Sequence, residues 1–175
     1  SVSIQINVAQ GSLVATIAGS TSRGLRTNGL LTIDASGSAD EDHDLRLGVD
    51  SNLLYSYSCS QTSPSFKTVS DLVLSNPTTS SVTIQVPPNI SLTPVGSVHT
   101  LLIVVSSRVD SRSSSISVQI TILPSLAPVV SLSSESGVRI NPSQKFKLVG
   151  AIDATSGGVV TWSVNDPSID LSLLA

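Results

Sequence analysis

The sequence predicts an all-β protein in which short strands build β-sandwiches, and three observations support this. Alternation of apolar and polar residues with a period of two is the dominant pattern along the chain, as expected for half-buried strands. Several such runs recur at regular spacing with turn residues between them, which is typical of a sandwich. No segment combines a helical period with capping residues at both ends.

Two runs alternate most clearly. The run SISVQITIL, residues 115–123, places four apolar residues on one face: Ile116, Val118, Ile120 and Ile122. The run SVTIQVPP, residues 81–88, does the same with Val82, Ile84 and Val86. The prolines at 87 and 88 should end this strand, because proline cannot donate a ladder hydrogen bond.

Two further runs predict more central strands. The run LLIVV, residues 101–105, is continuously apolar, which predicts a central strand covered on both faces. The run LLYSYSC, residues 53–59, places Leu53, Tyr55, Tyr57 and Cys59 on one face and serines on the other. Cys59 is the only cysteine, and this position predicts a buried, inert thiol.

The chain also repeats itself. SVSIQINV at residues 1–8 resembles SISVQITI at residues 115–122, an offset of 115 − 1 = 114, and each copy is followed by a short hinge and another apolar strand. This indicates a tandem array of Ig-like or fibronectin-like β-sandwich modules. The predicted divisions are residues 1–10 as the last strand of a preceding module, 11–125 as a complete sandwich, and 126–175 as the N-terminal part of a following module. Trp162 is expected in the core of that third segment, on its third strand.

One motif resembles a known family. LTIDASGSADEDHD, residues 31–44, followed by LLYSYSCSQTS, resembles the REJ (receptor for egg jelly) module and, more loosely, the PKD repeat of polycystin-type extracellular proteins. The residues that match are Asp34, Ser36, Ser38 and Asp40 in the turn and Tyr55, Tyr57 and Cys59 in the strand. The chain departs from the pattern at Tyr57, where the family has tryptophan, and it lacks the PKD sequence W-D-F-G-D-G. The resemblance implies Ig-like or fibronectin-like sandwiches in long extracellular or ciliary-surface proteins that act by adhesion, spacing or assembly.

Composition narrows the classes of function. The chain has 175 residues, a net charge of −3 and 12% charged residues, and it has no basic cluster of the kind that nucleic-acid phosphates require. No apolar run approaches the roughly 20 residues of a membrane helix. Low charge with many serines and threonines favours an extracellular or cell-surface location.

The acidic run at residues 40–44 raises the question of a metal site. Carboxylates bind calcium, and Asp34, Asp40 and Asp42 are the candidate ligands. The spacing lacks the glycine and the distal glutamate of an EF-hand loop. The alternative is a structural turn, in which Asp34 and Ser36 bond nearby backbone amides while the other acidic residues are solvated. We expect the turn and no cofactor, with calcium as the alternative.

Catalysis is not indicated. A nucleophile needs a base within hydrogen-bond reach, and the chain has two histidines, His43 in the acidic loop and His99 at the start of an apolar strand. His43 is expected to be a loop residue and His99 a strand-edge side chain. Known nucleophile, zinc and phosphate motifs are missing from the sequence. We therefore expect no catalytic residues and no enzyme activity.

Two surface features remain. Asn89 in NIS is the only glycosylation sequon, because proline follows Asn76 and Asn141. The charges of SRVDSR, residues 107–112, are expected in a solvated hairpin turn.

These observations predict a non-catalytic structural or adhesive module of a large extracellular, cell-surface or flagellar-surface protein, as part of a filament or ectodomain. Its expected partners are neighbouring modules of the same chain or other copies in an assembly, together with glycans. A calcium- or carbohydrate-binding module is the alternative, although only 3% of residues are aromatic, which disfavours sugar stacking.

Overall fold

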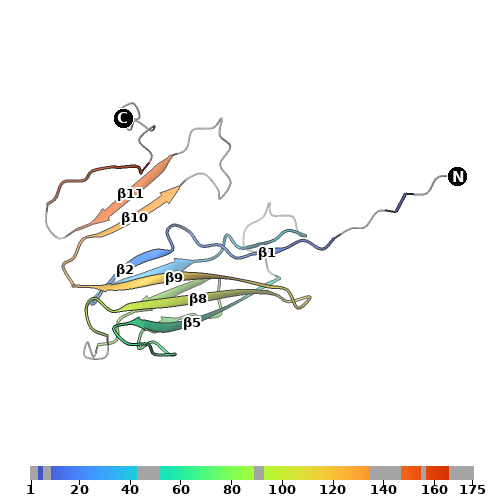
Figure 1. The fold of residues 1–175 in the computed structure, drawn as a ribbon, viewed down its shortest axis with the longest axis horizontal. Helices are drawn as coiled ribbons and strands as arrows, with labels where there is room; N and C mark the ends of the chain where they lie inside the picture. Colours follow the sequence, from blue (N-terminus) through green and yellow to red (C-terminus); the bar gives the residue numbers. More distant parts are fainter. Residues whose placement is uncertain are drawn as a thin grey trace.

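The computed structural model describes residues 4–5, 9–42, 52–88, 93–134, 147–154 and 157–165. Its described part contains strands and no helix, so the all-β prediction is confirmed there. Figure 1 shows two layers of strands, with a separate hairpin outside them. Since no helix is present in these ranges, none is long and apolar enough to cross a membrane.

The first layer is a four-stranded sheet. Its order is β2 (Ser22–Arg26), β9 (Ser113–Leu123), β8 (Val98–Ser107) and β5 (Leu53–Ser63). The pairs β5–β8 and β8–β9 are antiparallel, whereas β2 runs parallel to β9. Strand β2 lies at one edge of the sheet, beside β9, which is the last strand of the sandwich in the sequence.

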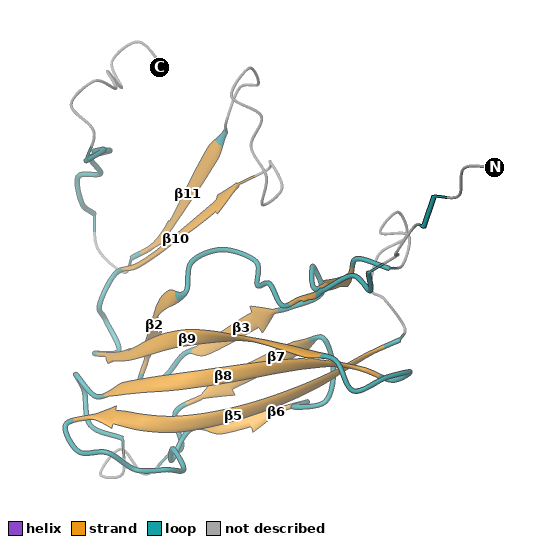
Figure 2. Cartoon of the chain, turned by 45° about the vertical axis from the view of Figure 1, so that its right-hand side comes forward, coloured by secondary structure: helices purple, strands orange, loops and turns teal. Residues whose placement is uncertain are grey.

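The second layer is a three-stranded antiparallel sheet, which lies behind the first in Figure 2. Its order is β3 (Leu30–Asp34), β7 (Ser81–Gln85) and β6 (Val73–Ser75). A short ladder of β1 (Leu13–Val14) with β4 (Ala39–Asp40) lies near the end of this layer. Outside these layers, β10 (Val129–Ser134) and β11 (Leu148–Asp153) form a separate antiparallel hairpin.

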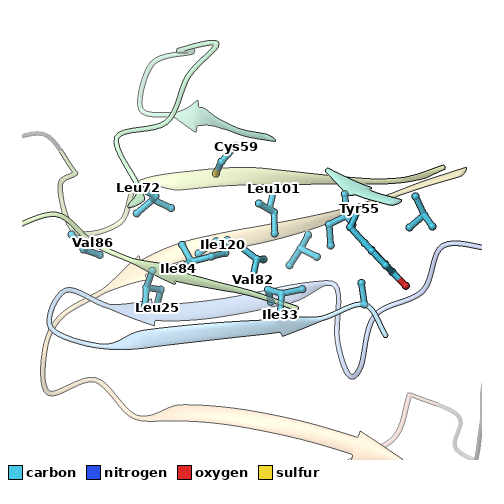
Figure 3. Packing of buried hydrophobic residues seen from close by; sticks show 14 of the residues in the cluster. Leu25, Ile33, Tyr55, Cys59, Leu72, Val82, Ile84, Val86, Leu101 and Ile120 are labelled. Atoms are coloured by element: carbon cyan, nitrogen blue, oxygen red, sulfur yellow. The ribbon is translucent and has the colours of Figure 1, made fainter. Parts of the chain in front are cut away.

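The hydrophobic core lies between the two sheets (Figure 3). Its fully buried side chains come from both layers, among them Ile33, Val82, Ile84, Leu101, Ile103, Ile120 and Ile122. Alternating β-branched residues meet across the layers because successive side chains of a strand point to opposite faces. The predicted inward faces of residues 115–123, 81–88 and 53–59 are confirmed, with Ile116 and Tyr57 half-buried at their margins.

The prediction for residues 101–105 is wrong for one face. The run is central in its sheet, and Leu101, Ile103 and Val105 are buried. Leu102, however, is 37% exposed, because no second layer covers the outer face of β8 in the described residues. The continuous apolar run therefore belongs to a central strand, but to one whose sheet is covered on one face only in the described residues.

The expectation for Trp162 is also wrong. Residues 157–165 form no strand, and Trp162 is 54% exposed. Its ring lies over Gly150 of β11, where an added Cβ would come within 2.9 Å of the indole. A tryptophan can be central to a core only if a second sheet closes over it, and the described part of this segment has one hairpin. The divisions at residues 10 and 126, and the Ig-like tandem arrangement, stay predictions.

Candidate functional site: an arginine–carboxylate cluster

In the acidic turn after β3, Asp34 and Ser38 form hydrogen bonds that hold the turn in place. The Asp34 Oδ1 atom accepts a hydrogen bond of 2.9 Å from the Ser36 amide, as an Asx turn requires. Ser38 is buried, and its hydroxyl bonds both backbone groups of Thr16, at 3.1 and 3.2 Å. The turn chemistry predicted for Asp34 is therefore present, and Ser38 ties the turn to the segment that follows β1.

Asp40 has a different environment from the one expected. It is 1% exposed, and both carboxylate oxygens bind the Arg112 guanidinium, at 2.9 Å to Nη1 and 2.7 Å to Nη2. This bidentate pairing is the strongest geometry that a carboxylate offers an arginine. Arg112 comes from the turn between β8 and β9, 72 residues away in the sequence. The expectation that Asp40 is solvated is wrong.

The same guanidinium collects further acceptors. Nη1 lies 3.0 Å from Asp42 Oδ2 and 2.7 Å from the Gly11 carbonyl oxygen, and Nε donates to Asp110 Oδ2 at 2.9 Å. Two backbone amides complete the arrangement, since Gly11 donates to Asp42 and Ser12 donates to Glu41, at 2.8 and 3.1 Å. One arginine thereby joins three parts of the chain: the segment before β1, the turn after β4 and the β8–β9 turn.

The pKa values of Arg112 and Asp110 both shift so that the charged form of each group is favoured. The hydrogen bonds that Arg112 donates to Asp40, and then those to Asp110, raise the pKa of Arg112. Hydrogen bonds from Arg112, its backbone amide first, lower the pKa of Asp110. In the cluster, the Arg112 cation is surrounded by the carboxylates of Asp40, Asp42 and Asp110. The charges at 108–112 lie in a hairpin turn as predicted, but Asp110 and Arg112 are ion-paired there and not merely solvated.

The cluster bears directly on the calcium candidates. Asp40 and Asp42 are brought together, and a guanidinium occupies the position between them that a cation would take. Asp34 serves its own Asx turn. Within the described ranges, no three acidic, histidine or cysteine side chains are grouped to hold a metal ion. The geometry is that of an internal tie between segments.

His99 and two serines form a second polar group, in the core. His99 is fully buried on β8, so the expectation of a strand-edge side chain is wrong. Its Nδ1 atom lies 2.8 Å from Ser70 Oγ, and its Nε2 atom lies 3.0 Å from Ser97 Oγ. A neutral imidazole has one donor and one acceptor and satisfies both hydroxyls. Burial lowers the pKa of His99, because it disfavours the charged form of the ring.

Cys59 extends this group. Its thiol bonds Ser70, yet burial is the larger effect and raises the pKa of the thiol, which makes it unreactive. An attack by Ser70 or Cys59 on a substrate would require access, and Cys59, Ser70, Ser97 and His99 are all buried. The described hollow of about 440 Å³ is lined by other residues, near the β10–β11 hairpin. The contact between His99 and hydroxyls therefore serves packing.

The remaining candidates lie elsewhere. Asn89 and His43 fall outside the described residues. Sequence reasoning missed Arg112 as the centre of the cluster and Ser70 and Ser97 as partners of His99. The D-x-R spacing of Asp110 and Arg112 is a local signal for a paired turn, but nothing local indicates that Asp40 meets the same arginine.

Comparison with known families decides the affiliation. The family model described as the REJ domain matches residues 1–174. The chain belongs to the REJ domain family. The resemblance read from residues 31–44 is confirmed by this match, whereas the looser likeness to the PKD repeat stays a prediction.

The other comparisons add little. No curated protein matches the chain. Among solved structures, it is similar to a nucleoside hydrolase-related hypothetical protein from Saccharophagus degradans that is associated with carbohydrate metabolism, with 21% identity and a TM-score of 0.46. That similarity covers 65% of this chain and 26% of the other, about a quarter of its length. A likeness of this degree assigns neither a fold nor an activity to this REJ chain.

Proposed function

We propose that this REJ chain is a non-catalytic structural module of a large extracellular or cell-surface protein, in which Ig-like units set spacing and orientation. The observation that carries the proposal is the REJ match over residues 1–174. The two polar clusters in the described residues support it, because both connect segments of the chain to one another. Arg112 joins three segments at one end of the sandwich, and His99 joins two serines inside it. Polar groups used in this way stabilise shape and leave no exposed reacting group among them.

A role in a filament or in adhesion is the more specific form of this proposal. The outer face of the four-stranded sheet supports it, because that face combines hydroxyl residues with the exposed Leu54 and Leu102. The paired register puts Leu102 between Ser58 of β5 and Ser117 of β9. Strands β5, β8 and β9 contain no aspartate, glutamate, lysine or arginine, and such an uncharged surface suits lateral contact with another module or copy.

The calcium- or carbohydrate-binding alternative has less support. Calcium would have to displace the guanidinium of Arg112 from Asp40, and both oxygens of Asp40 already accept its N–H groups. Thermal unfolding with calcium and with a chelator tests this, because a ligand that binds the folded state raises the melting temperature. We expect equal melting temperatures, and a rise with calcium concentration would favour the alternative.

The extracellular location has its own test. An epitope inserted at Pro77, in the exposed turn between β6 and β7, should be accessible to antibody on intact cells that express the parent protein. Staining that requires permeabilised cells would contradict the proposal. Mass loss on enzymatic deglycosylation, abolished by Asn89→Gln but not by Asn76→Gln, would show the predicted glycan and the secretory route together.

A further inference from the structure

Arg26 bridges the sandwich and the β10–β11 hairpin. It is the last residue of β2, and its side chain is 13% exposed. Its Nε atom donates to the Ala127 carbonyl oxygen at 2.7 Å, and its Nη1 atom lies 2.6 Å from Asp153 Oδ2. Its Nη2 atom donates to the Asp153 carbonyl oxygen. One guanidinium therefore holds both the linker and the end of β11.

The linker makes this bridge more effective. Residues 124–128 contain two prolines and a turn in which the Ala127 amide donates to the Pro124 carbonyl oxygen at 3.1 Å. On the sandwich side, the Thr27 amide donates to the Leu123 carbonyl oxygen at 3.1 Å. A proline-containing linker has few free torsions, and a planar fork bound to three acceptors removes rotation that remains. Lysine offers a point charge and could not bind the three acceptors in one plane.

The residues around Arg26 recur in the second unit. The sequence GLRTNG at 24–29 corresponds to GVRINP at 137–142, an offset of 139 − 26 = 113 for the two arginines. The acceptor recurs as well, since Ile33-Asp34-Ala35 corresponds to Ile152-Asp153-Ala154, an offset of 153 − 34 = 119. Each unit thus carries one copy of the arginine and one copy of the aspartate.

Gly24, the first residue of the GLRTNG motif, lies close to the side chain of Leu123. Gly24 pairs with Thr121, and a Cβ added to it would lie 2.5 Å from Leu123 Cδ1. Leu123 is the last residue of β9 and directly precedes the linker. A larger residue at this position would have to displace the Leu123 side chain, which lies directly before the linker.

We propose that Arg26 and Asp153 form a clamp between consecutive units, in which the arginine at the end of β2 of one unit holds the aspartate that ends the second hairpin strand of the next. The partner that this surface fits is the following unit of the same chain. By the repeat, Arg139 is the arginine that would hold the next unit in line, and Asp34 is the aspartate that would receive an arginine from the preceding one. The clamp deepens the proposed function, because it fixes the orientation that a spacer needs.

The test measures the distance distribution across the junction. Spin labels at Ser117→Cys on β9 and Val130→Cys on β10 report the relative orientation, because both positions are exposed on opposite sides of the linker and Cys59 is buried. The parent chain should give one narrow distribution by electron–electron double resonance. Arg26→Gln and Asp153→Asn should each widen this distance distribution about two-fold or more, because the linker alone then limits the rotation of the hairpin relative to the sandwich.

Arg139→Gln is the matched control, with the same substitution in the same motif one unit later. It should leave the distribution as narrow as in the parent. Asp153→Asn controls for unfolding of the sandwich as the cause of any widening, because the Asp153 side chain is 75% exposed and lies outside the sandwich. Unchanged widths in both Arg26→Gln and Asp153→Asn would overturn the clamp, and so would equal widening by Arg139→Gln. A parent chain that is already broad would also overturn it, yet would leave the modular role intact as that of a flexible tether.

Discussion

The sandwich and the β10–β11 hairpin use the same strand chemistry and reach opposite degrees of burial. In the sandwich, Ile84, Ile103 and Ile120 are fully buried between two sheets. In the hairpin, Val130 is 62% exposed and Ile152 is 43% exposed, although Val130 and Leu132 alternate with serines as the core residues of the sandwich alternate with polar ones. The difference teaches that alternation specifies a strand, whereas burial depends on whether a second sheet faces it.

The largest expected effect comes from truncating one isoleucine in the sandwich and comparing it with the same substitution in the hairpin. Ile120→Ala leaves a cavity between two layers and should destabilise the sandwich by about 3 kcal/mol. Ile152→Ala in the hairpin should cost less than about 1 kcal/mol, because Ile152 is already 43% exposed and no second sheet covers it in the described residues. Chemical denaturation monitored by circular dichroism measures both. Equal losses would show that the hairpin is covered in solution and would break the comparison.

The next effect tests the Arg112 cluster, which joins three segments at one end of the sandwich. Arg112→Gln leaves Asp40 buried without its guanidinium, so the melting temperature of the sandwich should fall by roughly 5 °C or more. The matched control is Arg108→Gln in the same turn, where the side chain is exposed and the temperature should hardly change. A drop of similar size in both variants would assign the effect to the turn and not to the cluster.

Acid should act on the sandwich through His99. Its pKa lies below the ordinary value of 6.5 because burial disfavours the charged ring. The unfolded chain therefore binds a proton that the folded chain does not, and stability is complete above about pH 6.5 and declines as the pH falls below it. The melting temperature should fall between pH 7 and pH 5 in the parent, and by less in His99→Gln. Equal slopes in the two proteins would exclude His99 as the cause.

The smallest effect concerns Tyr57 at the margin of the core. Burial first, and then Tyr55 and Asp34, raise the pKa of Tyr57 to about 12, while its hydroxyl donates to the Thr79 carbonyl oxygen at 2.9 Å. The neutral phenol stabilises the fold below about pH 10, and this contribution is lost as the pH rises toward 12. Absorbance titration of the parent minus that of Tyr57→Phe should place this phenol near pH 12. A midpoint near 10 would mean that Tyr57 is solvated and lies outside the core.

Local sequence predicted much of the sandwich and little of its polar sites. Val118, Ile120 and Ile122 point inward as their alternation indicated, and Asp34 forms the expected Asx turn. Leu102 and Trp162 were misjudged because a residue's own run cannot show whether a second layer lies opposite. Asp40 and His99 were misjudged because their partners, Arg112 and Ser70, come from distant parts of the chain.

The sequence by itself determined the strands, their inward faces, the turn chemistry and the REJ affiliation, because each depends on residues that are close along the chain. The tertiary structure decided which apolar faces are covered, where the buried charges are paired, and that Arg26 meets Asp153 across the linker. These depend on contacts between distant segments, and such contacts exist only after the sheets have packed.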